Sequence, residues 1–128
     1  DPLFAAKLAQ AEIKAATLEM YELRTMSAIS AGGSPGTSAS AMKILGTELQ
    51  QLVREVALEA SAGYGNSYQP QACAPGGATI YPHRESGLEG PLDAALAPLR
   101  YFNERAGSIY AGSNEIQRNI LAKAALGL

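Results

Sequence analysis

Apolar residues recur every three or four positions along most of the chain, which is the spacing of an amphipathic helix. The first such stretch covers residues 3–29, which contain no glycine and no proline. Asp1-Pro2 precedes it, and a capping carboxylate followed by proline is a favourable helix start. Its apolar residues form two rows on different faces: Leu8, Ala11, Ala15 and Leu18, and then Ile13, Ala16, Met20 and Leu23. We therefore expect a long helix that needs covering on more than one side, ended by the glycines and proline of residues 32–36.

A second helix is expected from residue 37 or 38 to residue 62, followed by shorter ones at about 92–103 and from Ser113 onward. The second has a continuous apolar stripe and one costly interior glycine, Gly46. In the last helix, Ile116, Ile120 and Leu121 share one side. Residues 63–90 are rich in Gly, Pro, Ser and Tyr and poor in aliphatic residues, which predicts a long irregular loop. No run has strand character, so the expected fold is an all-α helical bundle.

Composition narrows the class of protein. At 47% hydrophobic and 17% charged residues, the chain can form a hydrophobic core. Its length of 128 residues suits one domain and is too short for a two-domain enzyme. The net charge is −2 and the basic residues are scattered, so no nucleic-acid partner is expected. No apolar run is long enough to span a membrane and no signal peptide is visible, which indicates a cytoplasmic protein. The chain starts at Asp1 rather than Met, and we interpret it as a fragment.

The single cysteine and the single histidine are not expected to form a functional site. Cys73 is the only cysteine, so no intrachain disulfide is possible, which fits a reducing compartment. His83, the only histidine, lies in the irregular segment without a second potential ligand nearby, so no metal site is expected.

The segment with the clearest chemical character surrounds the start of the last helix. Gly112 allows a close backbone approach to a flat ligand, and Ser113 can cap the helix that follows. Glu115 lies in the first turn, where negative charge suits the helix dipole. Tyr110 adds an aromatic plane beside them. From the residues alone, a helix cap with a packed tyrosine explains the segment as well as a ligand site does.

The same segment resembles the C-terminal signature of the acyl-CoA dehydrogenase family. It reads Ile109-Tyr110-Ala111-Gly112-Ser113-Asn114-Glu115-Ile116-Gln117-Arg118, and Ser40-Ala41-Met42-Lys43 resembles the family's Ser-Met-Ala-Lys helix start. More narrowly, Tyr101-Phe102-Asn103 and residues 44–51 resemble the large subunit of pimeloyl-CoA dehydrogenase-like enzymes. The resemblance implies a C-terminal helical domain over residues 1–128, cut from an N-terminal helical domain and a middle β-barrel.

The resemblance also implies the ligands and partners. The family is FAD-dependent and desaturates acyl-CoA thioesters in fatty acid metabolism, passing electrons to a partner such as electron-transferring flavoprotein. By resemblance, Ser113 and Glu115 contact FAD, and Tyr110 and Gly112 border the acyl thioester. Residues 59–65 occupy the place of a loop that reaches the FAD of a partner subunit, which implies FAD contacts for Glu59 and Gly63.

Ala111 departs from the family pattern in a position that matters for catalysis. Many relatives have glutamate there as the base that removes the α-proton, and alanine cannot take a proton. The catalytic residue is therefore unknown, and we expect the base upstream of residue 1.

Three functions remain open. The chain is part of an active dehydrogenase, a non-catalytic subunit of a heteromeric dehydrogenase, or a helical interaction module without a ligand. The isolated chain is expected to be inactive, and its apolar helix faces predict a homo- or hetero-oligomer.

Overall fold

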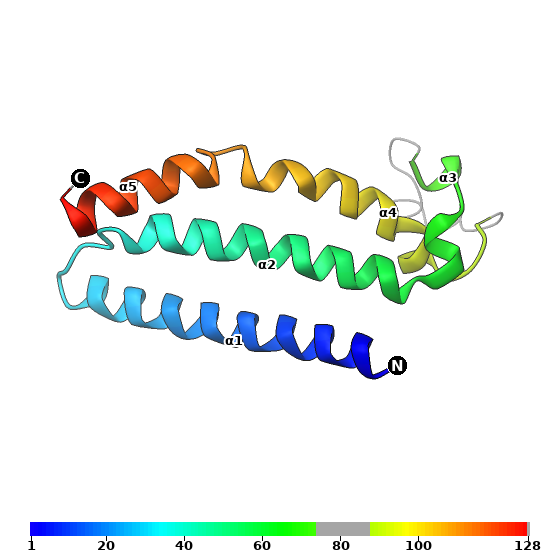
Figure 1. The fold of residues 1–128 in the computed structure, drawn as a ribbon, viewed down its shortest axis with the longest axis horizontal. Helices are drawn as coiled ribbons and strands as arrows, with labels where there is room; N and C mark the ends of the chain where they lie inside the picture. The colour runs from blue at the N-terminus through cyan, green and yellow to red at the C-terminus, as the bar shows by residue number, and fades with distance from the viewer. Residues whose placement is uncertain (74–87, 128) are drawn as a thin grey trace. The chain divides into compact units, whose positions relative to one another are not determined.

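The computed structural model describes residues 1–73 and 88–127, and every regular element in these ranges is helical. The predicted all-α class is therefore confirmed (Figure 1). The longer helices are α1 (Pro2–Ser30), α2 (Ser38–Ala60), α4 (Leu92–Glu104) and α5 (Asn114–Leu126). Short helices follow α2 and α4: η1 (Ala62–Asn66), α3 (Pro70–Cys73) and η3 (Arg105–Ser108). No helix in the described ranges is long and apolar enough to cross a membrane.

The chain divides into two compact units. The first contains Asp1–Leu52 and Ala106–Leu128, and the second contains Val53–Arg105. The first unit therefore holds α1, the beginning of α2 and α5, whereas the second holds the end of α2 with η1, α3 and α4. We describe each unit by itself.

In the first unit, α1 begins as its sequence predicts. Asp1 Oδ1 accepts a 2.7 Å hydrogen bond from the amide of Leu3, and Pro2 occupies the first turn, where its missing N–H costs nothing. The helix ends at Ser30, and Gly32 and Gly36 take the positive φ angles of 87° and 51° that the reversal toward α2 requires.

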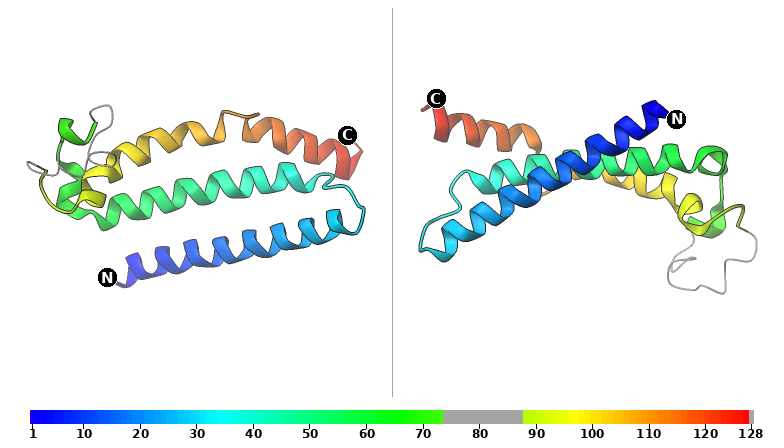
Figure 2. Two further views of the ribbon diagram at one scale, coloured as in Figure 1. Left: turned by 180° about the vertical axis from the view of Figure 1, so that it is seen from behind. Right: turned by 90° about the horizontal axis from the view of Figure 1, so that it is seen from below.

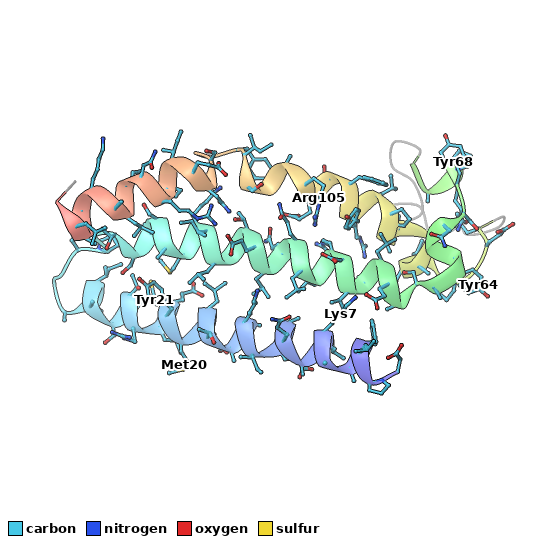
Figure 3. All side chains as sticks on the ribbon, viewed as in Figure 1. Lys7, Met20, Tyr21, Tyr64, Tyr68 and Arg105 are labelled. Carbon is cyan, nitrogen blue, oxygen red and sulfur yellow. The ribbon has the colours of Figure 1, made fainter. Side chains whose placement is uncertain are left out.

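The helices α1 and the beginning of α2 form a hairpin in the first unit, seen in both Figure 1 and Figure 2. Gly46 lies opposite Leu18, where an added Cβ would be 3.9 Å from Leu18 Cδ2. The Tyr21 hydroxyl lies 3.5 Å from Ser38 Oγ at the closed end. Figure 3 shows Tyr21 on the side of α1 that faces α2 and Met20 on the opposite side.

Much of the apolar surface of α1 is not covered. Only Ala11 and Thr25 are buried on this helix, while five large apolar side chains are more than half exposed: Leu3, Ile13, Met20, Leu23 and Met26. The prediction that the first helix carries apolar residues beyond those it can bury within this chain is therefore confirmed.

In the second unit, the boundary between α2 and η1 differs from the sequence prediction. The α-helix ends at Ala60 rather than at residue 62, and a 3₁₀-helix starts at Ala62. Ala62 has a φ of 47°, and a left-handed residue cannot continue a right-handed helix. The Ser61 amide closes the last turn by donating to the carbonyls of Ala57 and Leu58.

The predicted irregular loop over residues 63–90 contains short helices in its described part. η1 and α3 occupy most of residues 62–73, and residues 74–87, with His83, lie outside the described residues. The Gln69 side chain joins the two flanks. Its Oε1 accepts from the Glu89 amide at 2.8 Å and its Nε2 donates to the Glu89 carbonyl at 3.1 Å. The ring of Tyr64 lies against Gly90, which has a φ of 77°.

The core of the second unit is small. Ala72, Ala95 and Leu96 are buried together, with Leu88 and Leu92 packed against them. At the end of α4, the Arg105 guanidinium lies 4.3 Å from the centre of the Tyr101 ring, a cation–π contact.

Candidate functional site

The start of α5 has the capping geometry that its sequence predicts. Ser113 has extended φ and ψ angles of −60° and 158°, and its Oγ accepts from the Ile116 amide at 3.4 Å. Its carbonyl accepts the Gln117 amide at 3.0 Å, which is the first intrahelical bond. The first turn of α5 is therefore held by its own Ser113, as expected for a serine N-cap.

A polar network from α2 positions this turn. Asn114 is only 3% exposed, and its Oδ1 accepts a 2.8 Å hydrogen bond from Lys43 Nζ. Thr47 Oγ1 lies 3.1 Å from the same oxygen, and Lys43 Nζ also lies 3.4 Å from the Gly107 carbonyl. Because Lys43 and Thr47 are four residues apart on α2, both can reach one side chain of α5. The network connects two elements that are about seventy residues apart in sequence.

Asn114, Thr47 and Gly107 were not predicted as site residues. The sequence contains a weak signal for Thr47 alone, because Lys43 and Thr47 have the spacing of one helix face, on a helix whose neighbouring face is apolar. Nothing local identifies Asn114 as their partner, because the pairing depends on how α5 packs on α2.

The backbone before α5 is in the left-handed region for two consecutive residues. Ala111 has a φ of 57° and Gly112 a φ of 86°. Glycine adopts a positive φ without steric cost, whereas the positive φ of Ala111 is a strain in a non-glycine residue. An added Cβ on Gly112 would lie 2.7 Å from Gln117 Nε2. The Gly112 Cα therefore has a polar amide group directly against it.

Glu115 is exposed, and its pKa is lowered from the ordinary value of 4.5. The largest cause is a hydrogen bond from its own backbone amide, followed by a hydrogen bond from the Ser113 side chain, and Arg118 and Lys43 add favourable charge. Glu115 is therefore an ionised acceptor at neutral pH, held against the start of α5.

Arg118 on α5 forms an ion pair with a carboxylate of α2. Its Nη2 lies 2.5 Å from Glu48 Oε1 on α2. The side chains are 53% and 44% exposed, so this ion pair links the two helices at a partly solvated edge. Arg118 therefore bonds to Glu48 while its charge also contributes to the lowered pKa of Glu115.

Tyr110 and Ile109 lie just before the left-handed turn and are 55% and 69% exposed. The Tyr110 amide donates to the Ala106 carbonyl at 3.2 Å, which anchors the backbone while the ring stays accessible. Tyr110, Gly112, Ser113 and Glu115 are thus brought together at the start of α5, with Tyr110 and Glu115 open to solvent.

Glu59 and Gly63 belong to the second unit. Glu59 is exposed on the last turn of α2, and Gly63 is exposed in η1, with open space where a Cβ would stand. The open space at Gly63 leaves room for a ligand but does not by itself show which ligand binds.

The site at the start of α5 offers hydrogen-bond acceptors, an aromatic ring and a tight backbone turn. Ala111 adds no titratable group, so the turn itself has no general base. In the part of the chain that the structure describes, no cluster of His, Cys, Asp and Glu is arranged to hold a metal ion. The site is suited to binding and orienting a polar or flat molecule.

Comparison with known families identifies the class of protein. The family described as "Acyl-CoA dehydrogenase, C-terminal domain" matches residues 1–126. The chain therefore belongs to the acyl-CoA dehydrogenase family, whose members are oxidoreductases. No curated protein and no solved structure matches the chain significantly.

Proposed function

We propose that this chain serves as the C-terminal helical domain of an FAD-dependent acyl-CoA dehydrogenase that desaturates an acyl-CoA thioester between its α and β carbons. The observation that carries the proposal is the start of α5, where the Lys43–Asn114 hydrogen bond holds the turn that presents Tyr110, Gly112, Ser113 and Glu115. These residues belong to the region that matches the family.

The chemistry of this turn fits FAD. Bound FAD supplies the acceptor for the hydride that leaves the acyl β-carbon. Glu115 is an exposed carboxylate, and a hydrogen-bond acceptor suits the hydroxyl groups of the flavin's ribityl and ribose parts rather than its phosphates. Gly112 permits the close approach of a flat ring if the flexible end of the Gln117 side chain moves aside, and the exposed Tyr110 is available to border the thioester.

The proposed catalytic base does not lie within residues 1–128. Ala111 occupies the position of the family glutamate and has no group that accepts a proton. We propose that the base comes from a segment preceding Asp1 and that residues 1–128 act within a longer protein. The β-barrel and the N-terminal helical domain of that protein would complete the flavin site.

Flavin titration of the full-length protein is the direct test. We expect saturable FAD binding, weakened about tenfold by Glu115→Ala, which is the loss expected for one charge-assisted hydrogen bond. Glu12→Ala, an exposed carboxylate on α1, is the matched control and should bind FAD like the unchanged protein. Equal FAD affinity in Glu115→Ala would remove this residue from the flavin site. Absence of FAD binding would overturn the proposed function.

A second candidate function, a non-catalytic subunit of a heteromeric dehydrogenase, is favoured by Ala111 alone. It predicts a full-length protein that binds FAD but turns over acyl-CoA only after a partner subunit is added. An assay with an artificial electron acceptor separates the two, because an active subunit needs no such partner. The 128-residue chain alone should show no turnover in either case.

The exposed apolar side of α1 supports an oligomer interface. Ile13, Ala16 and Met20 border a shallow hollow of about 500 Å³ on this helix. Apolar burial contributes about 25 cal/mol per Å², so covering several hundred Å² favours association strongly. We expect at least a dimer by sedimentation at micromolar concentration, and Met20→Glu should shift it toward monomer. If the unchanged protein and the Met20→Glu variant both sediment as monomers, α1 does not form an oligomer interface. The helical interaction module without a ligand would then be the better description.

The remaining parts of the proposal rest on resemblance. They are a pimeloyl-CoA dehydrogenase-like large subunit, FAD contacts of Glu59 and Gly63, electron transfer to electron-transferring flavoprotein, and cytoplasmic fatty acid metabolism. Activity across acyl-CoA substrates, including dicarboxylic ones such as pimeloyl-CoA, would test the narrower assignment.

A further inference from the structure

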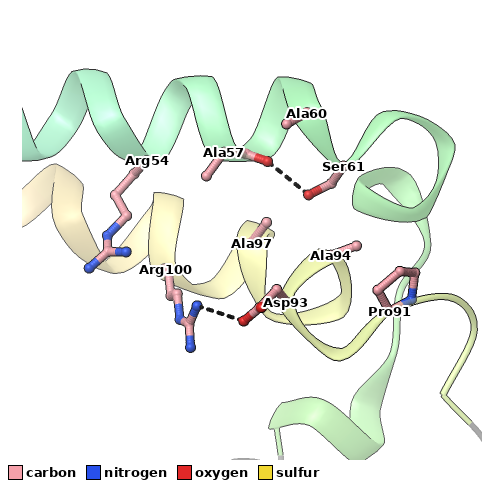
Figure 4. Close-up of a pocket in the computed structure, with 9 residues that line it drawn as sticks. All are labelled: Arg54, Ala57, Ala60, Ser61, Pro91, Asp93, Ala94, Ala97 and Arg100. Carbon is pink, nitrogen blue, oxygen red and sulfur yellow. Dashed lines mark hydrogen bonds and ion pairs between the residues drawn. The ribbon is translucent and has the colours of Figure 1, made fainter. Parts of the chain in front are cut away.

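A concave site lies in the second unit, next in sequence to Glu59 and Gly63. It is an open cavity of about 520 Å³ between the end of α2 and the start of α4 (Figure 4). This volume is within the usual range of small-ligand sites. Nine residues line it: Arg54, Ala57, Ala60, Ser61, Pro91, Asp93, Ala94, Ala97 and Arg100.

The walls of the cavity divide into an apolar floor and a cationic edge. Four alanines and a proline form the floor, and none of their side chains extends far enough to fill the space. Ser61 lies at the margin, but its hydroxyl proton is already donated to the Ala57 carbonyl at 2.8 Å. The donors available to a ligand are therefore the two guanidinium groups, which extend to the same side in Figure 4.

Both arginines are available to an anion. Arg54 is half-buried and has no hydrogen-bond or ion-pair partner among residues 1–73 and 88–127. Arg100 pairs with Asp93 at 3.4 Å, but the Asp93 side chain is 91% exposed. An exposed pair of this kind contributes little stability, so a better-placed anion can replace Asp93. The three charged residues leave the cavity with a net positive charge.

We propose that this cavity binds a small amphipathic anion, a carboxylate or phosphate monoester with a short aliphatic body. The head group pairs with Arg54 and Arg100, since guanidinium groups match the geometry of carboxylate and phosphate oxygens. The aliphatic body lies on the alanine floor and gains from the removal of apolar surface from water. Two lining residues, Ala60 and Ser61, lie within residues 59–65, but the expected binding of these anions does not require FAD.

The test is a titration of the purified protein with octyl phosphate, octanoate and inorganic phosphate, followed by calorimetry or by NMR shifts of Ala57 and Ala97. We expect saturable binding of octyl phosphate or octanoate, at least about tenfold tighter than inorganic phosphate. The two organic probes distinguish a phosphate from a carboxylate head group. Added salt should weaken binding, because the arginine edge is partly exposed.

Variants separate the head group from the body. Arg54→Gln with Arg100→Gln should weaken both organic probes by about tenfold or more, whereas Arg24→Gln on α1 should leave them unchanged. Ala57→Leu, at an exposed position on the floor, should weaken octyl phosphate more than inorganic phosphate. Thermal melting of each variant confirms that it is folded. The proposal is overturned if no organic probe saturates, or if the double arginine variant binds with unchanged affinity.

Discussion

Lys43 Nζ donates a 2.8 Å hydrogen bond to Asn114 Oδ1, and this contact joins α2 to the first residue of α5. Because Asn114 is almost completely buried, its amide oxygen depends on Lys43 and Thr47 for donors. The turn that carries Gly112 and Ser113 lies directly before Asn114. The contact therefore links the helix hairpin to the proposed flavin-binding turn.

Lys43→Met should destabilise the protein by about 1 to 3 kcal/mol, because a buried acceptor loses its charged donor. It should also weaken FAD binding, since the first turn of α5 loses its anchor. Chemical denaturation and flavin titration measure the two effects. Lys14→Met, an exposed lysine on α1, is the control and should change stability by less than about 0.5 kcal/mol. Equal stability of both variants would contradict a structural role for Lys43.

Gly112→Ala should destabilise the protein by about 1 to 2 kcal/mol, because its φ of 86° lies in the left-handed region. The steric part should be small, since the nearest atom is the end of the flexible Gln117 side chain. Ala111→Gly is the opposite experiment. Glycine relieves the positive φ of Ala111, so stability should stay unchanged or rise by up to about 1 kcal/mol. Thermal melting of both variants is the measurement, and a stabilising Gly112→Ala would refute the turn geometry.

Gly46→Ala should stabilise the protein by about 1 kcal/mol, which is the helix-propensity difference between the two residues. The space allows it, because the new Cβ would make an ordinary 3.9 Å contact with Leu18. Gly65→Ala provides the contrast. Its Cβ would lie 3.0 Å from Leu58 Cδ1 and 3.3 Å from the Leu58 carbonyl oxygen, so we expect a loss of about 1 to 3 kcal/mol. If urea denaturation shows the two substitutions to be equivalent, the packing described at both glycines is wrong.

Glu115 should make stability depend on acid pH. Its folded pKa is lowered, so its contribution is present above the ordinary value of 4.5 and is lost as the pH falls through the folded pKa. Glu115→Gln should therefore be less stable than the parent at neutral pH, and the difference should shrink as the pH falls below 4.5. Ser113→Ala should raise the pKa of Glu115, because it removes the serine hydrogen bond. Chemical denaturation at several pH values measures the stability difference, and NMR titration of the Glu115 carboxyl carbon measures the pKa. An ordinary pKa for Glu115 would contradict the described contact.

Local signals in the sequence determined the four longer helices and the starts of α1 and α5. Asp1 and Ser113 are followed by runs of helix-forming residues, and each caps its own neighbouring amide, at Leu3 and Ile116. These interactions span two or three residues, so they need no knowledge of the rest of the fold. The motif at residues 109–118 likewise indicated the family before any geometry was known.

Tertiary structure alone decided which side chains complete the site. The partner of Lys43 is 71 residues away, and the partner of Arg118 is Glu48 rather than the nearby Glu115. The left-handed φ of Ala111 and Ala62 was equally invisible, because alanine has no intrinsic preference for that region. Periodicity specifies which face of a helix is apolar, but the packing of one helix against another selects which polar groups meet across it.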